Sequence, residues 1–587
     1  MILQALTRQF EILCQQGKLA RPGWDTDFKV SFGLKLDETG ELLDVLDLRA
    51  EEQRGKKAVL IPRRMTVPHH TTRSSGVAAN LLCDNVSYLL GVDDKGKPER
   101  SKECFAAAAE LHHRLLDGVD APAARAILAY FDRWNPDVAR EHPLIAPLWK
   151  ELAGSANLML FYGMTPTSED EAIRAAWQNH YDSSDDDLPR AQCLVTGETA
   201  AIPLTHPKIK GVYDAQSSGA SLVSFNAPAL VSYGHEQNEN APVSKYAAFA
   251  YTSALNALLS DREHCRQIGD TTMVCWAEHG EECYQDAIWG GLFGTSEGVS
   301  DQDLAAMLKK IARGESCDWN GVTLRPEEHF YILGLSPNAA RISVRFFFQD
   351  SFGSFVQHID RHYEDTAIVR PSYDKREHLA VWQLLNETVN QNAKTKSPSP
   401  RLVGDVMRAI LGGTPYPASL LNGASLRIRA EHKVTRGRAA ILKAYYIRHP
   451  HPSVPKEVLT MNGDPNSTNI PYTLGRLFSI YEQIQSAALP NLNTTIADRY
   501  FNSAAATPAL TFSRLGSVAR SHLKVLHRDN EKAAIALEKK LIEYSAKIGD
   551  HYPTRLTLQE QGAFQLGYYF ETQQRFTKKN SDTAKED

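Results

Sequence analysis

The spacing of hydrophobic residues changes along the chain, and this change limits the possible folds more than any other feature. Near the start, hydrophobic side chains alternate with polar or small ones in DFKVSFGLKLD, at Phe28, Val30, Phe32, Leu34 and Leu36. Alternation of this kind is typical of a β-strand with two different faces. The next segment, DETG, supplies turn residues before ELLDVLDLR, so we predict a β-hairpin.

Helical spacing follows the hairpin. From Lys102 onward, FAAAAELHHRLL and AARAILAYFDRW have the spacing of helices, and SSDDDLPR after Asp182 predicts an exposed loop. Around Ala340 the sequence ARISVRFFFQD alternates again. The strand predicted there has two faces, one with Arg341, Ser343 and Arg345 and the other with Ile342, Val344 and Phe346. One face of this strand is therefore expected to be cationic.

The last part of the chain is expected to be a helical bundle. Two long helices are predicted there from spacings of three and four, one through Leu474, Leu477, Phe478, Tyr481, Ile484 and Ala488, and one through Ala534, Leu537, Leu541, Tyr544 and Ile548. Pro553 and Gly562 interrupt the helical pattern beyond Ile548, and the charged end from Thr577 is expected to fray. TKSPSPRLVG, near Ser397, is typical of a linker.

These patterns predict an α+β fold in three parts. The parts are a mixed body over residues 1–400, a basic connecting region over 401–460 and a C-terminal helical bundle over 461–587. At 587 residues the chain exceeds the size at which single hydrophobic cores stop growing, so more than one domain is expected.

Composition narrows the class of protein. The sequence has no run of about eighteen apolar residues, and MILQALTRQFEILCQQGK lacks the order of a signal peptide, so we expect a cytoplasmic protein with no membrane partner. Its eight cysteines contain no C-x-x-C pair, which argues against a zinc ribbon or a disulfide framework. Reduced, buried thiols are the favoured interpretation.

Charge is unevenly distributed. The net charge of −5 does not indicate a general nucleic-acid-binding protein. Between Arg401 and Thr460, however, ten Lys and Arg residues stand against three acidic ones. This segment is a candidate surface for phosphate groups.

The sequence offers no convincing active site. It has no G-x-x-x-x-G-K-[ST] loop, and AQSSGAS lacks the second glycine of a G-x-S-x-G elbow, so an NTPase or an α/β-hydrolase is not expected. Histidines occur close together at His69 and His70, His112 and His113, and His449 and His451. These pairs lack the spacing of three or four that helical metal ligands need, so solvated or capping roles are favoured and no cofactor is predicted.

Two stretches are rich in uncharged hydrogen-bonding side chains. VPHHTTRSSGVAANLLCDN contains Arg73, Ser74, Ser75, Asn80 and Asn85, and GVYDAQSSGASLVSFNAPALVSYGHEQNENAPVS contains Gln216, Ser217, Ser218, Asn226, Gln237, Asn238 and Asn240. Two interpretations stay open. Such side chains can donate to phosphate oxygens and base edges, or the loops can satisfy their own amides, because Ser and Asn are ordinary turn residues.

Several long strings carry a resemblance to a known family. They are RSSGVAANLLCDNVSYLLG, CLVTGE, HPKIKGV, AQSSGASLVSFNAPALVSYGHEQNENAPVS, AAFAYTSALN and LGLSPNAARISVRFF. Together they resemble the large subunit of the type I-C CRISPR Cascade complex, an RNA-guided DNA surveillance complex. The likeness runs from the first residues to Tyr568. Asp214 departs from it, since a glycine is expected there.

The resemblance implies a binding role rather than bond cleavage. In such complexes the guide RNA reads the target by base pairing, while the large subunit reads a short flanking motif in the duplex, helps to open the strands and guides the displaced strand. A separate helicase-nuclease is recruited to cut. The implied partners are the guide RNA-protein backbone of the complex, small helical subunits, target double-stranded DNA with its displaced strand, and the helicase-nuclease.

The resemblance and the residue chemistry together give one set of candidate DNA-binding residues. The set is Arg73, Ser74, Ser75, Asn80, Asn85, Lys210, Gln216, Ser217, Ser218, Asn226, Gln237, Asn238, Asn240, Arg341, Arg345, Arg427, Arg429, Lys433, Arg436 and Arg438. The polar loops are expected to face the flanking duplex and the point of strand separation, and the arginines to follow the sugar-phosphate backbone. For the arginines, a solvated strand face and ordinary helix charges are the alternative.

The family also implies that small subunits come from inside the large-subunit gene. Met461 is the last methionine and stands just before the predicted bundle. Lys456, Glu457 and Val458 can be encoded as AAG GAG GTN, a purine-rich ribosome-binding sequence at a suitable distance from an internal start at Met461. The alternative is that this tripeptide is simply part of the surface.

Two other functions remain as alternatives. A metal-dependent nuclease would use the histidines and acidic residues, but no ligand set has the right spacing. A stand-alone duplex-binding protein would bind tightly without guide RNA, which the acidic overall balance disfavours.

Overall fold

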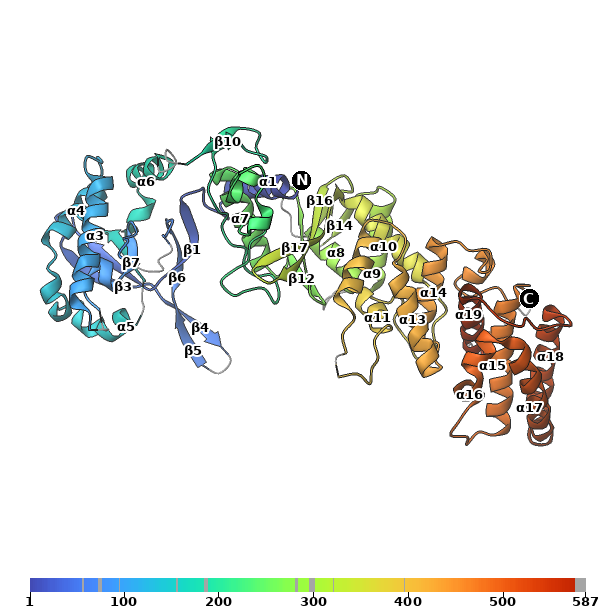
Figure 1. Ribbon diagram of the computed structural model, residues 1–587. Coiled ribbons are helices and arrows are strands. Elements are labelled where there is room, and N and C mark those ends of the chain that lie inside the picture. Colours follow the sequence, from blue (N-terminus) through green and yellow to red (C-terminus); the bar gives the residue numbers. More distant parts are fainter. Residues whose placement is uncertain are drawn as a thin grey trace, which may run out of the picture. The chain divides into compact units, whose positions relative to one another are not determined.

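The computed structural model describes the chain except for residues 55–56, 72–75, 94–95, 155–156, 184–187, 280–282, 295–300, 320, 395 and 576–587. The predicted loop after Asp182 and the predicted tail from Thr577 lie largely or wholly outside the described residues. The chain forms two compact units, one of Met1–Lys208 with Val223–Leu255 and the other of Ile209–Leu222 with Asn256–Asp587 (Figure 1). The predicted boundaries at 400 and 460 divide the chain in another way and stay a prediction.

The first unit is built on a five-stranded sheet. Its strands β2 (Phe32–Leu36) and β3 (Leu42–Asp47) form the predicted antiparallel hairpin. Strand β8 (Asn157–Tyr162) pairs with β2 in parallel. It also pairs in antiparallel fashion with β7 (Cys83–Asn85) and with the short β9 (Thr165–Pro166). The sheet is buried because Phe32, Leu34 and Leu36 all point into the core.

The predicted helices after Lys102 are confirmed. They are α3 (Pro98–Leu116) and α4 (Pro122–Arg133), and both begin with a proline in the first turn, where its missing N–H costs nothing. The hydroxyl of Tyr130 on α4 donates to the carbonyl oxygen of Leu89 over 2.7 Å, which fixes the helix to the core.

One part of the hairpin prediction is wrong. Phe28 and Val30 belong to β1 (Trp24–Val30), which pairs with β6 (Arg63–Pro68) in a separate two-stranded ribbon. The alternation continues through Ser31, but the amide of Ser31 donates to the carbonyl of Asn157, so the chain changes sheets there. Alternation of hydrophobic and polar residues indicates which side chains share a face of a strand, but it does not indicate which other strand pairs with it.

The remaining elements of the first unit are short or peripheral. They are α1 (Ile2–Gln15), β4 (Ala50–Arg54), β5 (Lys57–Ile61), α2 (Val86–Leu89), η1 (Pro136–Glu141), η2 (Ala146–Leu148), α5 (Trp149–Ala153), η3 (Thr167–Glu169), α6 (Glu171–Ser183), β10 (Arg190–Gln192), β11 (Thr199–Ala201), η4 (Pro228–Leu230), η5 (Gln237–Asn240) and most of α7 (Lys245–Ser260).

The second unit contains a four-stranded antiparallel sheet in the order β12-β13-β16-β17. Its strands are β12 (Cys265–Ile268), β13 (Thr271–Ala277), β16 (His329–Asn338) and β17 (Arg341–Ser351). All seven residues of β13 are buried, so this strand lies in the hydrophobic core with the helices that pack on it. The predicted strand near Ala340 is therefore an edge strand.

The C-terminal helices pack together as predicted (Figure 1). Helix α15 (Ile470–Ala488) contacts α16 (Ile496–Ala506), α17 (Pro508–Asp529), α18 (Glu531–Ile548) and α19 (Leu558–Gln574). Two glycines allow α15 and α19 to touch: a Cβ at Gly475 would lie 1.9 Å from the carbonyl oxygen of Phe564, and one at Gly567 would lie 2.0 Å from that of Tyr472. A mixed α+β body followed by packed helices is thus confirmed.

The other elements of the second unit surround these two parts. They are α8 (Cys283–Phe293), α9 (Asp301–Ala312), β14 (Cys317–Trp319), β15 (Val322–Leu324), α10 (Phe352–Thr366), α11 (Val381–Asn386), α12 (Pro400–Leu411), α13 (Ala418–Glu431), α14 (Arg436–Arg448) and η6 (Lys456–Leu459). The predicted linker TKSPSPRLVG is only partly correct: residues 396–399 have no helix or strand, but residues 400–404 form the start of α12, where Pro400 occupies the first turn.

Candidate nucleic-acid interface

The loop Ile209–Leu222 is attached to the edge of the four-stranded sheet. The amide of Ser221 donates to the carbonyl of Ala340 over 3.0 Å, and the amide of Ile342 donates to the carbonyl of Ser221 over 2.9 Å. Ser221 is therefore a parallel partner of Arg341 at the start of β17. Two segments that the sequence analysis singled out separately lie side by side.

The tip of this loop is exposed and uncharged. Gln216, Ser217 and Ser218 are all exposed, and the amide of Gly219 donates to the carbonyl of Gln216 over 2.9 Å, which closes a tight turn. Reciprocal backbone hydrogen bonds of 2.9 Å between Ile209 and Ala220 hold the base of the loop. The polar tip is thus presented by a braced scaffold.

Two further residues of this loop can now be placed. Asp214 has a φ of 57°, a left-handed conformation that glycine adopts most easily, and this explains why a glycine is expected there. Lys210 is exposed, and its amide donates to the side-chain oxygen of Asn256 over 2.8 Å. Its ammonium group stands at the surface near the base of the loop.

The predicted cationic face of β17 is only partly correct. Ile342 and Phe346 are buried as expected, but Val344 is 41% exposed. The reason is a β-bulge: Val344 pairs with Leu335 and Phe346 with Gly334, which leaves Arg345 as the extra residue. The regular alternation is lost at that point.

The two arginines of β17 have different surroundings. The guanidinium of Arg345 lies 3.0 Å from the carboxylate of Asp270, and its backbone carbonyl accepts a hydrogen bond of 2.6 Å from Arg408. Arg341 lies beside Ser221 and is half-buried. Arg345 therefore braces the sheet, and Arg341 is the arginine nearer the exposed loop.

The basic segment 401–460 is less basic at its surface than its composition indicates. Four of its ten cations are buried, namely Arg436, Arg438, Lys443 and Arg448. Burial lowers the pKa of Lys443 to about 8, and its ammonium donates to two backbone carbonyls. The local excess of charge thus overstates the phosphate-binding surface.

The predicted surface roles of Arg436 and Arg438 need correction. Arg436 donates to Asp374 over 3.0 Å and to the carbonyl of Glu377 over 2.7 Å. Burial raises the pKa of Asp374, but hydrogen bonds from the neighbouring arginines outweigh this and lower it to about 2. Arg438 pairs with Glu387 at 3.2 Å and also with Glu431. Both guanidinium groups are used inside the protein, so neither is part of an exposed surface.

Two of the other predicted cations of this segment are exposed, and the third is only partly so, with 13% of its side chain exposed. Arg429 and Lys433 are exposed, and Arg427 is half-buried near Glu431, with 3.6 Å between the charged groups. Arg429 also donates to the side chain of Gln561 on α19 over 3.0 Å. These three remain candidates for phosphate contact.

The second half of the polar stretch is a self-bracing loop. Asn238 is buried and donates to the carbonyls of Pro203 and Val243, while its oxygen lies 2.7 Å from His206, whose pKa is lowered by burial. Asn240 accepts from the amide of Ser232 over 3.0 Å. For these two asparagines the turn-residue interpretation is the better one.

Other candidates in that loop are nearer the surface. Asn226 is exposed, and Gln237 is half-buried with a φ of 45°. Tyr233, which the sequence analysis passed over, is 98% exposed with a φ of 53°. It begins a Tyr-Gly pair closed by the hydrogen bond from the amide of His235 to the carbonyl of Ser232. The dipeptide Tyr-Gly inside a polar stretch was the available signal for a tight turn.

The first polar stretch divides in the same way. Arg73, Ser74 and Ser75 lie outside the described residues. Asn80 is buried and accepts from the amide of Thr71 over 3.0 Å, and Asn85 accepts from the amide of Ser87 at the start of α2. The side chains of these asparagines hold the local backbone.

Comparison with known families adds what geometry does not show. A family model of a CRISPR-associated protein (Cas_Csd1) matches residues 6–576. The chain belongs to the Cas_Csd1 family. This confirms the resemblance to the type I-C large subunit and implies that other CRISPR-associated proteins are partners. A search of curated proteins found no match to the chain.

The structure of this Cas_Csd1-family chain gives no metal centre in its described part. Among those residues no group of three or more His, Cys, Asp and Glu side chains is placed to hold an ion. The solvated or capping role predicted for His112 is wrong. Its side chain is fully buried, and its Nε2 accepts a hydrogen bond of 2.9 Å from the amide of Leu82. In the same described part, no helix combines the length and apolar character needed to cross a membrane.

A group of arginines in the first unit was missed by the sequence analysis. Arg21, Arg63, Arg64 and Arg174 line one cavity of about 1010 Å³. They lie far apart in the sequence, on the loop after α1, on β6 and on α6. No local motif in the sequence predicts this group of arginines, because only the fold brings their side chains together.

Proposed function

We propose that this chain is the non-catalytic subunit that binds target double-stranded DNA, recognises the protospacer-adjacent motif, helps to open the strands and stabilises the resulting R-loop. It supports recruitment of the helicase-nuclease that cuts. The observation that carries the proposal is the exposed Gln216–Ser218 tip of a loop whose Ser221 pairs with Arg341 on β17. Uncharged side chains on a braced loop suit the reading of base edges, and a neighbouring arginine suits a phosphate.

The experiment compares guide-loaded complexes on matched targets that differ only in their flanking bases. Without this chain, discrimination between flanks is expected to disappear. In the complete complex, Gln216→Ala should relax flank preference, whereas Gln349→Ala, an exposed glutamine elsewhere on β17, should not. If discrimination survives removal of the chain, another subunit reads the flank and the proposal fails.

Two alternatives are separated by simple measurements. Chelator-sensitive cutting by the isolated chain would favour a metal-dependent nuclease. Tight duplex binding without guide RNA would favour a stand-alone DNA-binding protein. The proposal expects neither result, and it requires no cofactor.

Internal initiation at Met461 belongs to the same proposal. The helices α15–α19 share an aromatic core, with ring centroids of Phe478 and Phe564 5.8 Å apart, and a buried ion pair of 2.6 Å between Arg476 and Glu571. A shared core of this kind supports the proposal that the bundle folds by itself. Synonymous recoding of the codons for residues 456–458 is expected to abolish a short C-terminal product on a blot, and a product that persists would refute the initiation signal.

A further inference from the structure

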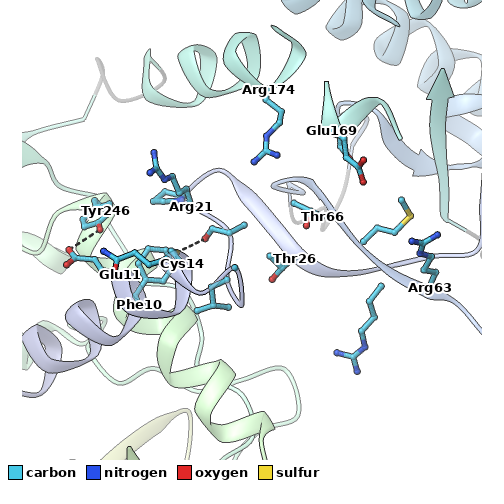
Figure 2. Close-up of a pocket in the computed structure, with 18 residues that line it drawn as sticks. Phe10, Glu11, Cys14, Arg21, Thr26, Arg63, Thr66, Glu169, Arg174 and Tyr246 are labelled. Carbon is cyan, nitrogen blue, oxygen red and sulfur yellow. Dashed lines mark hydrogen bonds between the residues drawn. The ribbon is translucent and has the colours of Figure 1, made fainter. Parts of the chain in front are cut away.

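We propose that the arginine-lined cavity of the first unit binds the sugar-phosphate backbone of a single nucleic-acid strand. The cavity has a volume of about 1010 Å³ and lies among α1, the β1–β6 ribbon, η3 and α6 (Figure 2). The Gln216 loop belongs to the other unit and contributes none of the residues that line the cavity. Strand binding in this cavity therefore does not depend on the proposed reading of flanking bases.

The charge of the cavity suits an anionic ligand. Its lining has four arginines and two glutamates, Glu11 and Glu169, which leaves an excess of two positive charges. The hydroxyl of Tyr246 donates to Glu11 over 3.3 Å, so this carboxylate already has a partner within the wall. Guanidinium groups bind phosphate oxygens with paired hydrogen bonds.

Three of the arginines are not neutralised by the protein. Within the described part of the chain, Arg21, Arg63 and Arg174 form no ion pair with a carboxylate. This differs from Arg345, Arg436 and other arginines whose acidic partners lie within hydrogen-bonding distance. Their hydrogen-bond donors are therefore available to an anionic ligand from outside the chain.

The scaffold holds these arginines in defined places. In β6, Arg63 pairs with Val30 and Arg64 with Lys29, so both come from a hydrogen-bonded ribbon. The guanidinium carbon of Arg174 lies 5.1 Å from the ring centre of Trp24, which limits its freedom. Figure 2 shows Arg21 and Arg174 near the same end of the ribbon and Arg63 further along it.

This linear arrangement fits a strand better than a small anion. The side chains of Thr26 and Thr66 lie along the ribbon between the arginines, where their hydroxyls can donate to successive phosphates (Figure 2). Tyr246 is 39% exposed at the cavity and offers a ring against which a base can stack. The volume is at the upper limit of the roughly 300–1,000 Å³ typical of ligand pockets, which suits a few nucleotides of a single strand.

A cysteine in the wall provides a local test. Cys14 lines the cavity and is half-buried, and burial raises the pKa of its thiol, so alkylation is best followed under alkaline conditions. In the full-length chain, a short single strand of mixed sequence is expected to slow alkylation of Cys14 several-fold. Cys265, Cys283 and Cys317 are also half-buried and lie in the other unit, so their unchanged labelling, read by peptide mass spectrometry, is the internal control.

Parallel arms identify the ligand. DNA and RNA strands share the chemistry of the sugar-phosphate backbone, so both are tested. Protection of Cys14 at a lower concentration of DNA indicates the displaced strand as the ligand, and protection at a lower concentration of RNA indicates the guide RNA. Duplex DNA, a mononucleotide and inorganic phosphate should give no protection at the same phosphate concentration. Equal protection by inorganic phosphate, or a bound strand that leaves Cys14 unprotected, overturns the proposal. Gln216→Ala should leave the protection unchanged.

Salt dependence measures the arginines directly. The double variant Arg21→Gln with Arg174→Gln is expected to lower the slope of log K against log salt for single strands by about 1.4, since each lost phosphate contact removes about 0.7. The control is Arg125→Gln, a surface arginine of the same unit that pairs with Asp120 at 3.1 Å. An unchanged slope in a double variant with the melting temperature of the wild type would contradict the proposal.

Discussion

The amide of Ile342 donates a hydrogen bond to the carbonyl oxygen of Ser221 over 2.9 Å, and this contact attaches the Gln216 loop to β17. As a result Arg341 is positioned by the loop, whereas Arg345 is positioned by Asp270 on the β12–β13 turn. Two arginines of one strand thus have different expected roles.

Substitution of these arginines should separate binding from stability. Arg341→Gln is expected to lower the slope of log K against log salt for duplex targets by about 0.9, the value for one phosphate contact to B-form DNA. Arg345→Gln should leave the slope unchanged and lower the melting temperature, because it leaves Asp270 unpaired. Binding isotherms at several salt concentrations, with thermal melts of both variants, test this. Equal slopes for both variants would remove Arg341 from the interface.

Tyr233 is expected to act through its ring. Stacking on an unpaired base stabilises by about 1–3 kcal/mol, so Tyr233→Ala should slow R-loop formation about 5- to 150-fold, while Tyr233→Phe should be near wild type. Tyr373→Ala is the matched control, because Tyr373 is 85% exposed on the other unit. Strand opening is followed by the fluorescence of a base analogue next to the flanking motif.

The backbone at Tyr233 gives a second, opposite expectation. A φ of 53° strains a tyrosine by an amount on the order of 1 kcal/mol and suits glycine. Tyr233→Gly should therefore raise the melting temperature slightly and still impair strand opening. Loss of opening with loss of stability would mean that the turn, rather than the ring, is what matters.

Much of the fold follows from local patterns, but the site does not. The hairpin β2–β3 and the helices α3, α15 and α18 arise from periodicities that each segment carries by itself. The pairing of Ser221 with Arg341 depends on contacts between distant segments, and the bulge at Arg345 moves side chains that alternation had assigned. Composition failed for Arg436 and Arg438, because a count of charges does not distinguish a buried guanidinium from an exposed one.

Arg436 and Lys433 should respond differently to the same change. Arg436→Gln leaves Asp374 with Arg376 as its remaining partner, but it removes the buried donor to Asp374 and to the carbonyls of Arg376 and Glu377. Buried polar groups left unsatisfied cost about 1–3 kcal/mol, so the variant is expected to destabilise the second unit. Lys433 is exposed, and Lys433→Gln should change stability by less than about 0.5 kcal/mol. Chemical denaturation measures both. A stable Arg436→Gln protein with weakened binding to every target would restore a DNA-contact role for this residue.

Acid should loosen the first unit through His112. This ring is buried, its Nδ1 donates to the carbonyl of Ala108 over 2.7 Å, and its Nε2 accepts from Leu82, so only the neutral form fits. Burial lowers the pKa of His112 from 6.5 to about 4. Because the pKa is lower in the folded state, the stabilising contribution is complete above the unfolded value and is lost as the pH falls through this window.

The expected loss at about pH 5 is about 2 kcal/mol, since each pKa unit corresponds to about 1.4 kcal/mol. His112→Gln keeps an acceptor for Leu82 without a titrating ring, so its stability should depend less on pH in this window. His451→Gln is the control, because His451 is exposed and should leave the pH dependence unchanged. Hydrogen exchange of α3 amides, corrected for intrinsic rates and followed across the window, localises the effect. A wild-type profile as flat as that of His112→Gln would show that the buried ring is not what makes this unit sensitive to acid.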